Sequence, residues 1–450
     1  MKYRSSANCQ LGEVYMMEGK PGRALEFLRR ALDYDVHSIK AQQVLATACR
    51  LFKQPDDARK ALNRILEIDP LNHLARFEHY LLEPEPQKLD VFKSLIRNEI
   101  PHETYLEIAM YYVSLGLEED ALRLLEVAPE QPAIRYWQAY LLRDRLPQRS
   151  REILRKASSL SPYLVFPFRG ESIPVFQWAD RSLPGDWKAK YYLGLIYWGL
   201  RRQEDALKAL ADCGDRPDFA PAYICRAWLE RDSDPKKALA DFERAHAVDP
   251  NDWRNWRRLA NFCSEQGMHE RAMTLAVEAS RRFPDEDLIR ILLARTYLNN
   301  GRYRDCYTVL EKATILPFEG QRDVHDLFVQ CQICLAMEAM KKGRFGEAIR
   351  HLEDSKEYPE RLGTGKPQDP DYRVQDYLMM LAYGEMGESA GAEEARGRIA
   401  EYASRNPRRA AEGSEAAVDQ WYRMSFKSQS ELEALRALTR LVQASRPRRN

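Results

Sequence analysis

The chain has 450 residues, of which 30% are charged and 44% are hydrophobic, and its formal net charge is only +1. This near balance argues against a nucleic-acid-binding protein, which usually carries a basic excess or stripe. The hydrophobic fraction excludes wholesale disorder. No apolar run reaches the roughly 18 residues that span a bilayer, and the N-terminus has no stretch of signal-peptide type. The eight cysteines are scattered through apolar helical patterns, so we expect reduced thiols in the cytoplasm.

One supersecondary pattern recurs along the chain. Two stretches of 3.6-residue periodicity are joined by a turn that contains glycine, as in "EQGMHERA" and "NNGRYRDC". The small residue that opens the second stretch returns at a spacing of 34, from Ala24 to Ala58, from Ala238 to Ala272 and on to Cys306. A single helix pair cannot bury its apolar face alone, so neighbouring pairs must stack. The pattern therefore predicts an all-α solenoid.

The residues at these spacings resemble the tetratricopeptide repeat family. The resemblance covers most of the chain, and it implies a right-handed α-solenoid of about ten helix pairs with no catalytic, cofactor or metal residues. The matching sequences are Leu11-Gly12-x2-Tyr15 with Ala24-x3-Leu28-x2-Ala31, Leu45-Ala46-x2-Cys49 with Ala58-x3-Leu62, Leu193-Gly194-x2-Tyr197 with Ala206-x3-Leu210, Trp256-x2-Leu259-Ala260-x2-Cys263 with Ala272-x3-Ala276, and Leu293-Ala294-x2-Tyr297 with Cys306-x3-Leu310.

The first part of the chain departs from the repeat at two places. We expect residues 1–162 to form an N-terminal sub-array, in which residues 73–101 are degenerate because "EPEPQK" interrupts them. Residues 163–186 are rich in aromatic residues and proline and contain one short helical pattern where a repeat has two. They predict a joint, with a kink, between two sub-arrays.

The second sub-array is expected at 187–407. Inserts at 316–328 and 358–372 interrupt it, and the first of them stretches the small-residue spacing to 42. Residues 408–450 predict a degenerate helical cap and a basic tail. From residue 396 onward there are twelve Lys or Arg against six Asp or Glu, which fits either contact with an anionic partner or a solvated terminus.

The order of "FPFRGESIPVFQWA", "PFEGQRDVHDLFVQ" and "YPERLGTGKP" is also similar to the repeat tail of a group of large bacterial proteins. In that group the tail follows an uncharacterised β-rich domain that has been likened to sugar-mutarotase folds. The resemblance implies a carbohydrate-related context and no catalytic residues in the tail. Since the chain opens inside a repeat without a polar cap, we expect that this domain is missing here.

Two short motifs invite a chemical interpretation. In "RLGTGKP" a Walker loop would need Gly at Glu360 and a hydroxyl at Pro367, so the glycines instead predict a turn with positive φ. Cys331 and Cys334 lie within "HDLFVQCQICLAMEAM", which predicts an amphipathic helix with both thiols on its buried face. A zinc site would need two further ligands at suitable spacing, and the sequence offers none.

The family resemblance implies that the first helix of each pair lines a concave groove. An arginine followed four residues later by asparagine resembles the start of a carboxylate clamp, although Leu292 stands where the next repeat would supply asparagine. The alternative is that the aromatic residues pack between repeats and the arginines pair with nearby Glu. The candidate groove residues are Lys188, Tyr191, Trp198, Tyr223, Arg254, Arg257, Asn261 and Arg295.

These features predict a non-catalytic scaffold that binds a protein or peptide segment in the groove. One rival is an accessory helical module of a carbohydrate-related bacterial protein, which rests on the second resemblance alone. Another is an enzyme built on the 316–372 inserts, which would need a convergent pocket of titratable groups there. A spacer that binds nothing specific is the last alternative.

Overall fold

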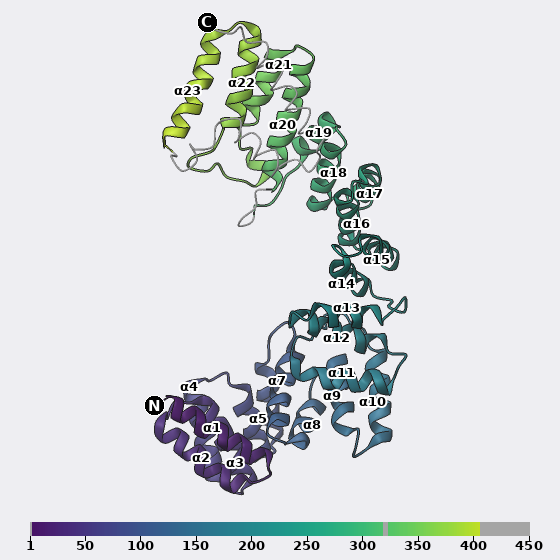
Figure 1. Ribbon diagram of the computed structural model, residues 1–450. Coiled ribbons are helices and arrows are strands. Elements are labelled where there is room, and N and C mark those ends of the chain that lie inside the picture. Colours follow the sequence, from purple (N-terminus) through teal and green to yellow (C-terminus); the bar gives the residue numbers. More distant parts are fainter. Residues whose placement is uncertain (1, 318–322, 406–450) are drawn as a thin grey trace. The chain divides into compact units, whose positions relative to one another are not determined.

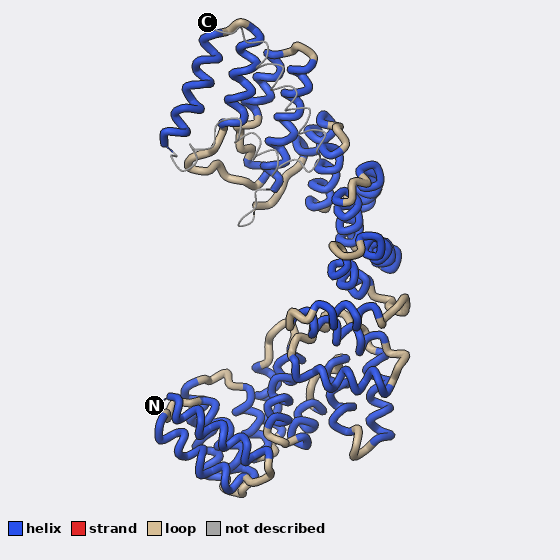
Figure 2. The backbone as a smooth tube through the Cα atoms, viewed as in Figure 1, coloured by secondary structure: helices blue, strands red, loops and turns tan. Residues whose placement is uncertain are grey.

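The computed structural model of the protein describes residues 2–317 and 323–405. Within these ranges it contains 23 α-helices, two 3-10 helices and no strand (Figure 2). The chain divides into two compact units, Met1–Leu229 and Glu230–Asn450. The all-α prediction is therefore confirmed. The predicted cap and basic tail at 408–450 lie outside the described residues, as do residues 318–322 of the first insert.

Most helices follow one another with connections of a few residues, and longer connections precede α11, α20 and α22 (Figure 1). The first unit contains α1 Lys2–Met17, α2 Pro21–Tyr34, α3 Ile39–Leu51, α4 Pro55–Ile68, α5 His73–Leu82, α6 Pro86–Leu95, α7 Pro101–Ser114, α8 Glu118–Glu126, α9 Pro132–Leu142, α10 Pro147–Ser159, α11 Ile173–Ser182, α12 Trp187–Gly199 and α13 Gln203–Ala211. Helix α14 (Ala220–Glu230) contains the boundary. The second unit continues with α15 Pro235–Val248, α16 Trp253–Glu265, α17 His269–Arg282, α18 Asp287–Asn299, α19 Tyr303–Lys312, α20 Asp323–Lys341, α21 Phe345–Asp354, α22 Arg373–Met386 and α23 Ser389–Arg405.

Apart from α11, α14 and α15, the described helices pack as ten pairs of consecutive helices, in the order first helix, second helix, which is close to the number that the family resemblance implies. They are α1/α2, α3/α4, α5/α6, α7/α8, α9/α10, α12/α13, α16/α17, α18/α19, α20/α21 and α22/α23. Helix α11 has no such second helix and packs against α9 and α12. Residues 163–186 thus hold one α-helix, while the kink predicted there and the hand of the solenoid stay predictions.

Small residues explain how closely the paired helices approach. The fourth residue of α2, α4, α17 and α19 is Ala24, Ala58, Ala272 and Cys306, and each is at most 1% exposed. On the facing helix α12, a Cβ atom added to Gly194 would lie 2.7 Å from Leu210 Cγ in α13. The glycine and alanine positions of the repeat therefore mark the contact line between the two helices of a pair.

In several pairs the turn uses glycine in the left-handed region, whereas Lys53 and Arg201 take that conformation in the α3/α4 and α12/α13 turns. Between α16 and α17, Gly267 has φ +75°, and the N–H of Met268 donates to Cys263 O at 2.9 Å. Residues with a Cβ rarely adopt this conformation, which ends the first helix and starts the second within a few residues.

A buried ionic network joins three helix pairs of the first unit. Arg50 on α3 donates from Nε to Glu78 Oε2 at 2.8 Å, and its Nη2 lies 2.7 Å from Asp120 Oδ2 on α8. Tyr112 on α7 donates its hydroxyl to Glu78 Oε1 at 2.8 Å. Glu78 is only 1% exposed. Although burial alone lowers it, the Glu78 carboxylate raises the pKa of Arg50 well above its usual value, so the guanidinium stays charged.

The helix that contains Cys331 and Cys334 differs from the prediction. Both thiols are buried, as expected, but α20 is buried on nearly every face and is not amphipathic. Its polar side chain His325 is covered because Tyr358 stacks on the imidazole, with ring centroids 4.0 Å apart. His325 Nε2 also bonds to Glu357 O at 3.0 Å. The insert at 358–372, which we call the second connector, thus packs over a helix face that the sequence pattern left to solvent.

Candidate functional site

The predicted groove residues fall into both compact units. Lys188, Tyr191 and Trp198 lie on α12 and Tyr223 on α14, all within the first unit, whereas Arg254, Arg257 and Asn261 on α16 and Arg295 on α18 lie in the second. The two groups are therefore two separate sets of candidates.

Three candidates of the first unit are part of its core. Lys188 is buried, and its Nζ donates to Ser158 O at 2.5 Å. Tyr191 is 2% exposed and packs edge-on against Phe219, and burial raises its pKa. Tyr223 is 1% exposed and donates its hydroxyl to Pro217 O at 3.0 Å. These contacts fit the alternative that aromatic side chains pack between repeats, so we remove the three from the candidate surface. Trp198 is half-buried and remains on it.

The candidates of the second unit share one surface, which we call the arginine face: Arg254, Arg257, Asn261 and Ser264 on α16 with Arg295 and Asn299 on α18. Spacings of three and four residues place each helix's members on one side. Asn299 Nδ2 donates to Ser264 Oγ at 2.9 Å, which joins the two sides. Arg295 and Asn261 each lie one turn earlier on their helices, so we expect them to face each other as well. The sequence pattern alone missed Asn299, although its spacing of four from Arg295 indicated it.

The arginines of this face differ in how they are satisfied. Arg254 is exposed, pairs with Asp252 at 3.3 Å and stacks on Trp253, with its guanidinium carbon 4.4 Å from the ring centroid. Arg257 and Arg295 are half-buried, and neither has a hydrogen-bond or carboxylate partner among residues 2–317 and 323–405. Half-buried guanidinium groups of this kind suit bidentate capture of a carboxylate. The arrangement can therefore bind an acidic group.

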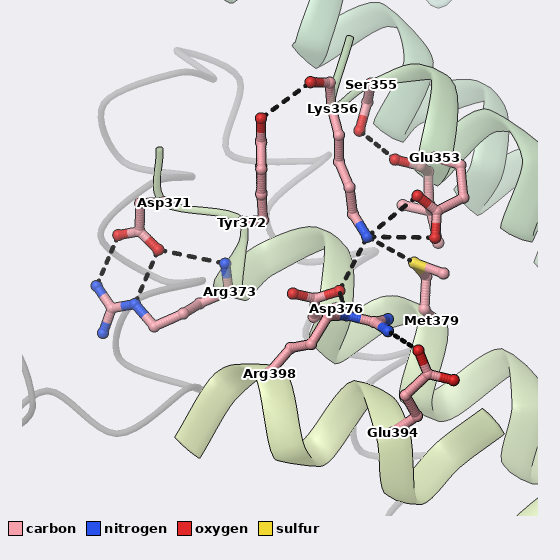
Figure 3. Close-up of polar contacts among 11 residues, drawn as sticks. Glu353, Ser355, Lys356, Asp371, Tyr372, Arg373, Asp376, Met379, Glu394 and Arg398 are labelled. Atoms are coloured by element: carbon pink, nitrogen blue, oxygen red, sulfur yellow. Dashed lines mark hydrogen bonds and ion pairs between the residues drawn. The ribbon is translucent and has the colours of Figure 1, made fainter. Parts of the chain in front are cut away.

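A cluster of charged groups lies where α21, α22 and α23 meet the end of the 358–372 connector, and it could be mistaken for a catalytic site (Figure 3). Asp376 Oδ1 on α22 accepts from Lys356 Nζ at 2.9 Å and from Arg398 Nε on α23 at 2.8 Å. Tyr372 donates its hydroxyl to Lys356 O at 3.0 Å. Asp376 and Lys356 are largely buried and charge-paired. The cluster ties α21, α22, α23 and the connector together, which is a structural task.

The glycine motif of the same connector forms a turn. Gly363 follows a 3-10 helix (Glu360–Leu362) with φ +68°, as the sequence predicts. A Cβ at this position would lie 2.7 Å from Ile315 O, and the N–H of Ile315 donates to Arg361 O at 2.7 Å. The glycine therefore lets the two connectors pass closely, and the geometry does not resemble a phosphate loop.

Metal ligands and membrane spans were sought within the described part of the chain. No group of three His, Cys, Asp or Glu side chains there is placed to hold a metal ion. No helix in residues 2–317 and 323–405 is both long enough and apolar enough to cross a bilayer.

Comparison with known families identifies part of the chain directly. Residues 15–76, which span α2 to α4 and their flanks, match the family model described as tetratricopeptide repeat. The chain is a repeat protein with a tetratricopeptide repeat near its start. Beyond residue 76, Ala238, Ala272 and Cys306 are buried small residues that keep the spacing of 34. Nothing in the comparisons bears on a β-rich domain.

A search of the curated proteins finds no significant match. Among solved structures, PilF of Pseudomonas aeruginosa is similar at 18% identity, with 49% of this chain and 92% of PilF covered and a TM-score of 0.30. A tetratricopeptide repeat protein of Parabacteroides merdae matches at 15% identity over 62% of this chain and 98% of its own, with a TM-score of 0.28. With TM-scores this low, neither structure supports an inference about function.

Proposed function

We propose that this tetratricopeptide repeat protein is a non-catalytic scaffold that binds an acidic peptide or protein segment across the arginine face. Tetratricopeptide repeats generally mediate protein–protein interactions. The observation that carries the proposal is the pair Arg257 and Arg295. Both are half-buried on adjacent first helices, and neither has an acidic partner among the described residues.

Binding would follow from the geometry of the face. A carboxylate between Arg257 and Arg295 would gain two charge-assisted contacts, and Asn261 would offer an amide beside them. Each charged hydrogen bond contributes about 1.5–3 kcal/mol, which corresponds to about 10–100-fold in affinity. The exposed Arg254, stacked on Trp253, would extend the contact to a second acidic group.

The test uses the purified chain as bait in a lysate of its own organism, with bound proteins identified by mass spectrometry. An Arg257→Glu/Arg295→Glu variant is expected to lose the partner that the wild type captures. The matched control is Arg281→Glu/Lys312→Glu, which makes the same charge change on the exposed surface of α17 and α19. Circular dichroism verifies that each variant is folded. Equal capture by both double variants, or no capture by the wild type, would contradict the proposal.

The carbohydrate-related module remains the alternative proposal. It rests on the sequence resemblance, and binding of the purified chain to a glycan array would support it. Glycan binding that survives Arg257→Glu/Arg295→Glu would separate it from the arginine face.

A further inference from the structure

The connection between α10 and α11 presents large apolar side chains to solvent. Within the first unit, Tyr163 is 70%, Leu164 47%, Phe166 57% and Phe168 54% exposed. We call these four residues the aromatic strip. Single exposed apolar side chains are ordinary, but four within six residues form a contiguous patch of the kind that marks an interaction site.

Buried neighbouring residues and an ion pair hold the aromatic strip in place. Pro162, Val165 and Pro167 are buried between the exposed residues, and the N–H of Val165 donates to Pro162 O at 3.2 Å. At the end of the strip, Arg169 forms an ion pair with Glu103 of α7, and its guanidinium carbon lies 4.3 Å from the Phe168 ring centroid. These buried side chains fill the inward positions and leave the four large side chains on the outside. A preformed surface of this kind loses little conformational entropy on binding.

The backbone of the strip has an open edge. From Val165 to Phe168, buried and exposed side chains alternate, which is the period of an extended chain. Phe166 and Phe168 are two residues apart, so their N–H and C=O groups point to the same edge. None of these four groups has a hydrogen-bond partner within the described residues. Pro167, which has no N–H, falls on the opposite edge.

We propose that the aromatic strip binds an extended, apolar segment of a partner polypeptide by backbone pairing at Phe166 and Phe168. An extended segment satisfies the open N–H and C=O groups, as in strand addition to a sheet edge. A bound helix has no free backbone groups along its length and would leave them unpaired. The partner's alternate side chains would contact the two phenyl rings, which favours Val, Ile and aromatic residues at every second position.

The charges around the strip favour a partner without net charge. Arg169, whose guanidinium lies over Phe168, is compensated by Glu103 and lies 3.8 Å from Glu107. A membrane surface would need an excess of basic side chains here. The strip therefore differs in chemistry from the arginine face, and it extends the proposed function to a second, separate binding surface.

The experiment uses the full chain and a synthetic library of nine-residue peptides in which Val, Ile, Phe or Tyr alternates with Thr or Ser. We expect the wild type to select peptides that bind at least tenfold more weakly to Phe166→Ser/Phe168→Ser. The Leu146→Ser control removes an exposed leucine from the connection between α9 and α10 and is expected to bind like the wild type. Methylation of the amide nitrogens on one edge of a selected peptide should abolish binding, and this readout does not depend on how a variant folds.

Three results would overturn the proposal. In the first, the wild type binds no peptide more tightly than the double variant does. In the second, a selected peptide still binds when the amide nitrogens of either edge are methylated. The third is a dimer in solution that Phe166→Ser/Phe168→Ser dissolves, because a second copy of the chain would then cover the strip.

Discussion

The buried network around Glu78 makes a sharp prediction about stability. In Glu78→Gln the side chain keeps its shape, but its amide nitrogen turns N–H groups toward a donor, either Arg50 or the Tyr112 hydroxyl. If the nitrogen takes the place of Oε1, one charge-assisted bond from Arg50 and the acceptor of Tyr112 are lost. If it takes the place of Oε2, the bond from Arg50 Nε is lost. Breaking one partner of a buried ion pair typically costs about 3–5 kcal/mol, and Glu78 at 1% exposure meets that condition.

The measurement is urea unfolding followed by far-UV circular dichroism. We expect Glu78→Gln to lower the free energy of unfolding of the transition that includes the first unit by about 3–5 kcal/mol. Arg59→Met is the control, because Arg59 pairs with Glu83 in the same unit while both side chains stay 36–42% exposed. Exposed pairs contribute about 1 kcal/mol or less.

A double-mutant cycle with Arg50→Met isolates the pair itself. If Arg50 and Glu78 act together, the double variant should be at least about 1.5 kcal/mol more stable than the two single losses added. The reasoning is refuted if Glu78→Gln costs no more than Arg59→Met, or if the two single losses simply add.

Three further predictions concern packing, protonation and thiols. Gly194→Ala should destabilise the chain by up to about 2 kcal/mol in the same urea assay, because overpacking against Leu210 outweighs the helix propensity of alanine. In Gly199→Ala, on the same helix, the added Cβ would have nothing within 4 Å, so this control should be neutral. Burial lowers the pKa of six histidines, His325 among them, below the ordinary 6.5. Between about pH 7.5 and about 5.5 the unfolded chain therefore binds more protons than the folded chain, so the melting temperature should fall as the pH is lowered over this range. The fall should be less steep in His325→Gln. Most thiols are buried, so a thiol reagent should modify the half-buried Cys225 first and all eight cysteines only in urea. Rapid modification of several thiols in the folded chain would contradict this burial.

The helix pairs could be predicted because single small residues at fixed positions mark the contact between the two helices. Ala24 and Ala58 are 34 residues apart, as are Ala238 and Ala272, and all four lie buried at the fourth position of their helices. The turn at Gly267 could likewise be read from a glycine between two periodic stretches, because its backbone has positive φ.

The burial of the predicted groove residues could not be read from the sequence, because burial depends on which other segments pack over a helix. Lys188 and Tyr191 occupy positions that the repeat pattern assigns to a groove, yet the C-terminal end of α10 and Phe219 cover them. In α20 the connector residue Tyr358 covers His325. Such contacts come from irregular segments, whose packing does not follow the repeat period. The aromatic strip is also an irregular segment, so the repeat period could not predict that its rings stay exposed.

The central claim is that a partner segment touches the arginine face, and site-specific photo-crosslinking tests it most directly. A photo-reactive amino acid would replace Asn261, which lies one turn after Arg257 on α16, in chain incubated with lysate of its own organism. The account predicts a crosslinked polypeptide whose attachment site contains Asp or Glu, lost when Arg257→Glu is added. A crosslink that persists in that variant, or that forms equally well from position 281 on α17, would contradict it.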